Sequence, residues 1–167
     1  MGMYQNLKDI VRVFRYDETL LRLLYYPIKD ITSNTKDPLD NSLQDILRMS
    51  ESTIWEIRDK SIFLTSKSDD LELEPLCRIY LYAGRRRSDR NSYIMASQEI
   101  TVDIFCHSEF EKDLRSLRIS DRINELLVDE RITGFGKIEY VSGYPIQAPN
   151  DYVAYRHIYE FGSSNSW

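Results

Sequence analysis

Two runs of alternating hydrophobic and polar residues frame the stretch CRIYLYAGRRRSDRNSYIMASQEITVDIFCH, residues 77–107. In residues 77–82 every odd position is aliphatic or cysteine, and in residues 99–104 every even position is aliphatic. A period of two is typical of a β-strand, because successive side chains point to opposite faces of a sheet. The stretch therefore predicts two strands of one sheet with an aliphatic face toward the core. The other face, which carries Glu99, Thr101 and Asp103, is expected to be wet or covered by another chain.

Four arginines stand between these two runs: Arg85, Arg86, Arg87 and Arg90. We expect them at the tip of the hairpin that joins the strands, because a solvated and screened turn tolerates like charges that repel one another. Arginine pairs with a carboxylate through two parallel hydrogen bonds, which fixes geometry as well as charge. We therefore predict that the cluster docks on an acidic surface of a neighbouring protein. A solvated tip and a contact with DNA phosphates are the alternatives.

The segments around this hairpin show helical and extended patterns in turn. In the first predicted helix apolar residues recur at i, i+3, i+4 and i+7, and Asp17 is placed to cap the second. The predicted helices cover residues 7–15, 18–26, 53–58 and 119–127, and the further predicted strands cover residues 62–65, 136–143 and 151–162. This order of elements predicts an α+β fold. We expect a mostly antiparallel β-sheet with helices packed on one face, two N-terminal helices and a long loop arm.

We expect one domain spanning residues 1–167, with residues 163–167 as a flexible tail. The arm runs from about Asp30 to Met49 and is rich in polar residues, including Asp37 and Asp40. Such a segment buries too little apolar surface to order itself, so we predict that a neighbouring subunit or ring supplies the missing contacts. A mobile loop is the alternative.

Tyrosine is abundant, with 12 copies in the chain. Tyr80, Tyr82, Tyr155 and Tyr159 are predicted to lie on the sheet face opposite the aliphatic one. Tyrosine buries apolar area and keeps a hydrogen-bonding tip, which suits protein interfaces. We therefore expect an assembly surface on that face, and aromatic residues decorating a half-exposed sheet are the alternative.

The composition excludes several classes of protein. The net charge of -5 and the sequence pI near 5.1 argue against a wholly basic nucleic-acid-binding domain. No apolar run is long enough to span a bilayer, and the start MGMYQNLKDIV lacks the pattern of a signal peptide. Cys77 and Cys106 both fall within strand patterns, so we expect buried free thiols rather than a disulfide or a metal site.

The sequence gives little support for a catalytic or metal-binding site. His107 and His157 have no second histidine or cysteine at ligand spacing. Glu99 and Asp103 share a strand face, but four residues along a strand span roughly 13 Å, too far for a direct carboxylate pair. The stretch TGFGKIEY lacks the spacing of a phosphate-binding loop. We therefore expect no enzyme, no cofactor and no bound metal.

The order of motifs resembles a known family. The stretches YQNLKDIVRVFRYDETLLRLLYY, DPLDNSLQDIL, LCRIYLYAGRRR, EITVDIFCHS, RISDRINELLVDERITGFGKI and IQAPNDYVAYRHIYEFG look like those of tail-terminator and tail-completion neck proteins of long-tailed bacteriophages. The resemblance implies a structural virion protein, made in the bacterial host cytoplasm. It implies a homo-oligomeric ring, commonly a hexamer, on the end of the tail tube. Its implied partners are copies of itself, the tail tube protein and head-completion proteins, without a membrane and with DNA only as passing cargo.

Three alternatives remain open at this level. A head-closure, or stopper, protein sits one ring nearer the capsid and has similar sequence features. A nucleic-acid-binding regulator would place the arginine cluster on phosphates. A hydrolase would use His107 with Asp103, and it would need a pocket around those two residues.

Overall fold

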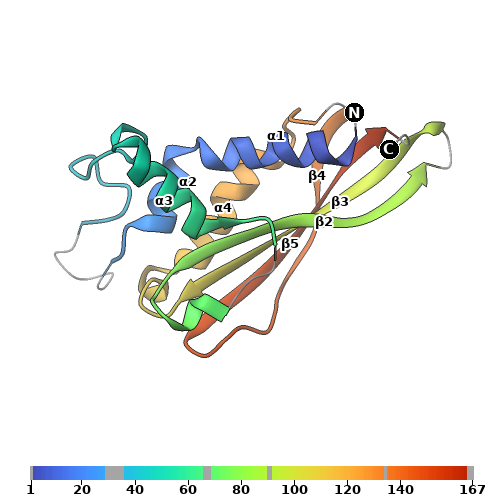
Figure 1. Ribbon diagram of the computed structural model, residues 1–167. Helices are drawn as coiled ribbons and strands as arrows, with labels where there is room; N and C mark the ends of the chain where they lie inside the picture. The colour runs from blue at the N-terminus through green and yellow to red at the C-terminus, as the bar shows by residue number, and fades with distance from the viewer. Residues whose placement is uncertain (1, 29–35, 66–68, 90–91, 134, 165–167) are drawn as a thin grey trace.

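A five-stranded mixed sheet with α-helices packed on one face forms the body of the protein, as the α+β prediction requires (Figure 1). The computed structural model describes residues 2–28, 36–65, 69–89, 92–133 and 135–164. The helical elements are α1 (Met3–Arg15), α2 (Glu18–Tyr25), η1 (Ile46–Arg48), α3 (Glu51–Ser61), η2 (Asp69–Glu72), η3 (Glu111–Asp113) and α4 (Arg115–Leu127). The strands are β1 (Ile62–Phe63), β2 (Cys77–Asp89), β3 (Ser92–His107), β4 (Phe135–Pro145) and β5 (Tyr152–Ser164).

The strand order across the sheet is β1-β2-β3-β5-β4. Neighbouring strands are antiparallel except for the short parallel pair of β1 and β2. At the C-terminal end, Ser163 and Ser164 pair with β3, although the sequence assigned them to a flexible tail. These two serines can pair because β3 is long and offers Ala96 and Met95 as their partners. Residues 165–167 of that tail lie outside the described residues.

The β2–β3 hairpin is longer than the sequence predicts, and this corrects the position of the arginines. Arg85, Arg86 and Arg87 lie within β2 rather than at the turn, since Arg86 pairs with Gln98 and Arg87 with Ser97. An irregularity between residues 83 and 86 absorbs one extra residue and lets the strand continue. The predicted turn residue Arg90 lies outside the described residues. Figure 1 shows the far ends of β2 and β3 extending past the N-terminal end of α1.

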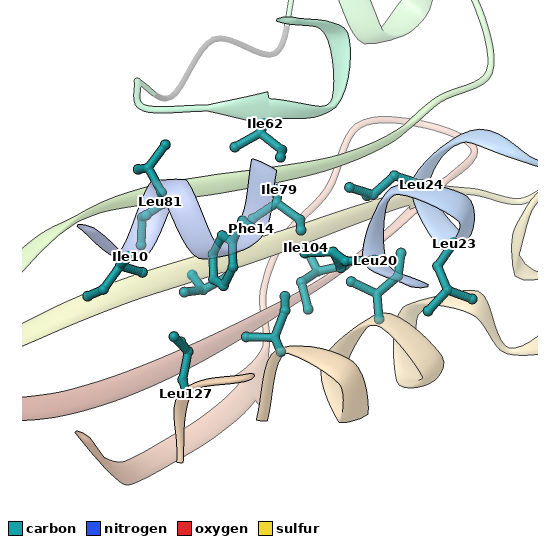
Figure 2. Packing of buried hydrophobic residues seen from close by; sticks show 14 of the residues in the cluster. Ile10, Phe14, Leu20, Leu23, Leu24, Ile62, Ile79, Leu81, Ile104 and Leu127 are labelled. Atoms are coloured by element: carbon teal, nitrogen blue, oxygen red, sulfur yellow. The ribbon is translucent and has the colours of Figure 1, made fainter. Parts of the chain in front are cut away.

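The main hydrophobic core lies between the sheet and the helices α1, α2 and α4 (Figure 2). The predicted aliphatic face is confirmed, because Ile79, Leu81, Ile100, Val102 and Ile104 are fully buried in it. Asp17 caps α2 as predicted, accepting a hydrogen bond of 2.8 Å from the amide of Leu20. The cap holds α2 where its leucines enter this core.

The opposite sheet face is not wet at the end near the start of β2, so this part of the prediction is wrong. Residues 69–76, here called the strap, and residues 146–148 cover it within the same chain. Beneath them lies a second, smaller cluster of buried side chains: Leu71, Tyr80, Phe105 and Ala154. The strap carried no helical or strand pattern long enough to be predicted as a cover. Its packing depends on contacts that only the folded sheet provides.

Candidate interaction surfaces

The distal part of β2 carries exposed positive charge. Arg85 and Arg87 are exposed, and neither makes an ion pair within the described part of the chain. The irregularity next to them includes Gly84, where an added Cβ would lie 3.2 Å from the Cβ of Glu99. This close approach lets β2 stay paired with β3 while it bends. The hairpin therefore holds the two guanidinium groups on a paired strand beyond the helices.

A row of three glutamates crosses the same end of the sheet. Glu160 of β5 lies directly opposite Glu99 of β3 on one side and Glu139 of β4 on the other. Directly paired residues share a sheet face, so the three carboxylates lie side by side on the face opposite the helices. We call these three residues the glutamate row. Like charges directly opposite each other on a sheet are destabilising.

No side chain of the described residues forms an ion pair with the glutamate row. Glu139 is exposed, and Glu99 and Glu160 are half-buried. Among the described residues, no side-chain hydrogen bond or ion pair reaches any of the three carboxylates. Beside the row is a hollow of about 630 Å³, lined by Glu139, Glu160, Arg87, Lys137 and other residues of β2–β5. Glu139 and Glu160 of the row thus line one side of an open depression.

Sequence reasoning missed the glutamate row. The three residues are distant in the chain, and no sequence spacing relates one to another. The register of β3 against β5 and of β5 against β4 brings them together. A correct strand alignment would have been the only signal, because a shift of one residue moves a side chain to the other face.

The tyrosines predicted to form an assembly surface fall into two groups. Tyr80 and Tyr82 lie on the predicted face, but Tyr80 is only 2% exposed and packs under the strap. Tyr82 donates a hydrogen bond of 2.6 Å to Asp103, which also pairs with Arg156 at 2.7 Å. Burial, and then the Asp103 carboxylate, raise the pKa of Tyr82 to about 12. Tyr82 is thus a hydrogen-bond donor in a polar cluster internal to this chain.

Tyr155 and Tyr159 lie on the helix-covered face, so their predicted placement is wrong. Tyr155 pairs with Ile104 and Tyr159 with Ile100, both of which face the core. Tyr159 is fully buried, and its hydroxyl donates to the side-chain oxygen of Asn124 on α4. Burial raises the pKa of Tyr159. Tyr155 and Tyr159 share one face of β5, but the spacing of two residues in a strand does not say which face meets the helices.

The arm is held by its own chain over residues 36–49, against the prediction that a partner must order it. Asp37 pairs with Arg118 of α4 at 2.9 Å, and this hydrogen-bonded partner lowers the pKa of Asp37. Asp40 accepts hydrogen bonds from the amide and hydroxyl of Ser42. Arg22 of α2 donates to several oxygens of the arm. Polar side chains of the helices and the buried side chain of Ile46 therefore hold the arm within its own chain. Residues 30–35 of the arm lie outside the described residues.

His157 lies in the core rather than in a catalytic arrangement. It is 4% exposed, and its Nε2 lies 2.8 Å from the hydroxyl of Ser120 on α4. Its Nδ1 lies 3.0 Å from the hydroxyl of Tyr140. Gly143 makes room for this contact, because a Cβ there would come within 2.2 Å of the Tyr140 hydroxyl and 2.9 Å of Nδ1. Burial lowers the pKa of His157 below its ordinary value of 6.5.

The stability of the protein is therefore expected to fall in acid because of His157. The unfolded chain binds a proton at this histidine near pH 6.5, while the folded protein resists it to lower pH. Stability is thus fully present above the unfolded value and is lost as pH falls through it toward the folded pKa. The slope reaches at most about 1.4 kcal/mol per pH unit. Urea titrations at pH values from 7.5 to 5.5 should show that the unfolding free energy of His157→Asn depends less on pH than that of the wild type. An equal dependence on pH would contradict this prediction.

The last features that the sequence raised are the two cysteines, metal-binding groups and membrane-spanning helices. Cys77 and Cys106 are buried free cysteines, as expected, and lie directly opposite each other on β2 and β3. Within the described ranges, no group of three or more histidines, cysteines or carboxylates is arranged to hold a metal ion. None of the helices that the structure describes has the length and apolar character needed to cross a membrane.

Comparisons with known proteins give the family. The model of the YomW family matches residues 17–161. The "SPbeta prophage-derived uncharacterized protein YomW" of Bacillus subtilis (strain 168) is 31% identical over 176 residues, which covers 97% of this chain and 99% of that protein. A solved chain from a "Virion of native gene transfer agent (GTA) particle" aligns with a TM-score of 0.43 at 11% identity, over 72% of this chain and 90% of that one. A TM-score this low does not establish a shared fold.

Proposed function

This chain belongs to the YomW family, and on that premise we propose that it is a structural virion protein of a tailed phage or phage-like particle. Its relative in Bacillus subtilis is described as derived from a prophage, and it aligns along nearly the whole length of both chains. Phage particles are built largely from small repeated subunits, and this chain has the size of one such domain. The proposed role is assembly rather than catalysis.

Within such a particle, the protein forms a ring that terminates the tail tube and joins it to the head or neck. This finer role follows the resemblance of its motifs to tail-terminator and tail-completion proteins, whose rings are commonly hexamers. Its partners are then other copies of the chain, the tail tube protein and head-completion proteins. DNA passes through the ring as cargo. The virion is the place where the protein acts.

The observation that carries the proposal is the projecting β2–β3 hairpin with its exposed arginines. The hairpin extends beyond the helices, and Arg85 and Arg87 lack ion pairs within the described part of the chain (Figure 1). A projecting element on one side of a subunit that meets a different surface on the next subunit makes a head-to-tail contact. Repeated by rotation, such a contact closes into a ring. An extended hairpin is also the kind of element that reaches a neighbouring ring.

The proposal is tested by deleting the gene from a producing prophage and examining the particles by electron microscopy. If the protein terminates the tail, tails lacking it should grow past their normal length and stay separate from heads. Expression of the protein from a plasmid should restore normal tails. If tails keep their normal length and do not join heads, and if the heads leak DNA, the protein is a head-closure protein instead. Normal infectious particles without the protein would exclude both roles.

A second measurement examines the ring itself. Purified protein mixed with isolated tail tubes should add a disc-shaped density at one end of each tube, with rotational symmetry in averaged images. Protein without tubes provides the comparison, because a ring can depend on its partner for assembly. A bound subunit that stays single on the tube would contradict the ring.

A further inference from the structure

The described chain holds two unpaired sets of opposite charge that do not neutralise each other. The glutamate row crosses β3, β5 and β4, with no ion pair to any of its three carboxylates. Arg85 and Arg87 project from β2, also without ion pairs. Arg87 lies on the same sheet face as the row, opposite Ser97, which is two residues along β3 from Glu99. The two sets thus lie close together in one subunit and yet remain separate.

We propose that the glutamate row of one subunit receives Arg85 and Arg87 of the hairpin from a second copy of this chain. The inference rests on the proposed function in one respect, the self-association of the chain, and it names the contact that would build the ring. The acceptor is the glutamate row together with the hollow that Glu139 and Glu160 line, and the donor is the projecting part of β2.

Charge complementarity argues for this occupant. Three adjacent carboxylates repel one another, so a surface that carries them gains most from a partner with closely spaced cations. Arg85 and Arg87 are exposed residues two positions apart on β2, and each guanidinium group can meet a carboxylate through two parallel hydrogen bonds. Every copy of the chain presents both surfaces. A head-to-tail contact between copies therefore satisfies both sets without any other protein.

The shape of the face supports the same occupant. The hollow beside the row has a volume of about 630 Å³ and opens on the sheet face that the helices leave uncovered. The strap and residues 146–148 cover the other end of that face, and so a partner is directed to the end that bears the row. The hairpin reaches past α1, which leaves it accessible to a neighbouring subunit (Figure 1). Nucleic acid fits this acceptor poorly, because its phosphates carry the same charge as the row.

The experiment exchanges the charges. Variant A carries Arg85→Glu and Arg87→Glu, and variant B carries Glu139→Arg and Glu160→Arg. Self-association of the full chain is measured by sedimentation velocity at low ionic strength over a wide range of protein concentration. Each variant alone should associate at least about tenfold more weakly than the wild type. A one-to-one mixture of A and B should recover association, because each then offers the surface that the other needs, and so should a chain with all four changes.

Matched controls separate the contact from general effects of charge and folding. Arg48→Glu with Lys112→Glu makes the same change of net charge as variant A on exposed side chains of η1 and η3, and it should leave association unchanged. Circular dichroism and thermal melts check that each variant is folded. Arg85→Ser with Arg87→Ser provides a milder form of variant A in case the reversal disturbs the sheet.

Each outcome decides one point. Recovery in the mixture supports the contact, since charges that paired only within one subunit would not be restored by a second variant. Variants that associate as the wild type does, or a mixture that stays dissociated, overturn the contact. A wild-type chain that stays monomeric at every concentration also overturns it. If variant A associates normally but loses binding to duplex DNA in a gel-shift assay, the arginines bind phosphates instead. The gene deletion tests the tail role separately. A result that contradicts this contact therefore does not contradict the proposed ring.

Discussion

Replacing Arg22 with alanine is expected to lower the free energy of unfolding by about 3 kcal/mol and to release the arm. The side chain of Arg22 is only 7% exposed, although it lies on a short helix among leucines. Its Nη1 donates to the carbonyl oxygen of Asp40 at 2.9 Å, and its Nη2 donates to that of Leu43 at 3.0 Å. Its Nε also pairs with Glu18 at 2.9 Å.

The size of this effect comes from the oxygens that lose their donor. Glu18 accepts from Arg22 and from two backbone amides of the arm, those of Ile46 and Leu47. Ile46 is fully buried in the main core, so the arm is attached by one apolar anchor and one polar cluster. Without Arg22, the buried carbonyl oxygen of Pro38 and the partly buried carbonyl oxygens of Asp40 and Leu43 lose their donor, which costs more than an exposed ion pair would gain.

Limited proteolysis and urea denaturation measure the two parts of the prediction. Cleavage within residues 36–49 should become faster in Arg22→Ala, and the midpoint of urea unfolding should fall. Arg48→Ala is the matched control, because Arg48 is 83% exposed and pairs with Asp45 at 3.4 Å. That change is expected to cost less than about 1 kcal/mol. Equal protease resistance of Arg22→Ala and the wild type would show that the arm is ordered by something other than this cluster.

Replacing Arg78 with alanine is expected to have an effect of about 3–5 kcal/mol, because Arg78 fastens the strap to the sheet. Its side chain is 1% exposed, and it forms two parallel hydrogen bonds with Asp70 of the strap, at 2.7 and 2.9 Å. Its Nε donates to the carbonyl oxygen of Lys60 at 2.8 Å. The guanidinium carbon lies 3.8 Å from the centre of the Phe63 ring. One side chain thus joins α3, β1, β2 and the strap.

Loss of Arg78 should expose the aromatic face that the strap covers. Tyr80 and Phe105 pack there with ring centres 5.1 Å apart. Binding of a hydrophobic dye such as ANS should therefore increase in Arg78→Ala, together with a lower unfolding midpoint. Lys60→Ala removes a nearby exposed cation and keeps the backbone acceptor of Arg78, so it should leave both measurements near the wild type. A folded Arg78→Ala protein that binds no more dye would show that the strap stays in place without this residue.

Buried arginines show where reasoning from the sequence stops. A charged residue within an apolar pattern is normally assigned to solvent, because an unpaired buried charge is costly. Here Arg22 and Arg78 are buried with partners that lie on other elements, Asp45 and Asp70 among them. Backbone carbonyl oxygens supply the remaining contacts. Every residue has a backbone carbonyl oxygen, so the sequence does not show which of them accept hydrogen bonds from a buried arginine. No sequence pattern therefore identified the arm or the strap as ordered segments.

The sequence by itself determined the α+β class, the helices with the Asp17 cap, the central strands and their aliphatic face. These features follow from local periods of hydrophobicity and from local capping, which the order of residues encodes directly. Only the tertiary structure decided that Tyr159 faces the helices, that the arginines sit on a paired strand, and that Glu99, Glu139 and Glu160 form one row. Each of these depends on strand register and on which face is covered. Both are fixed by contacts between residues far apart in the chain, because a shift of one residue between strands reverses every side chain.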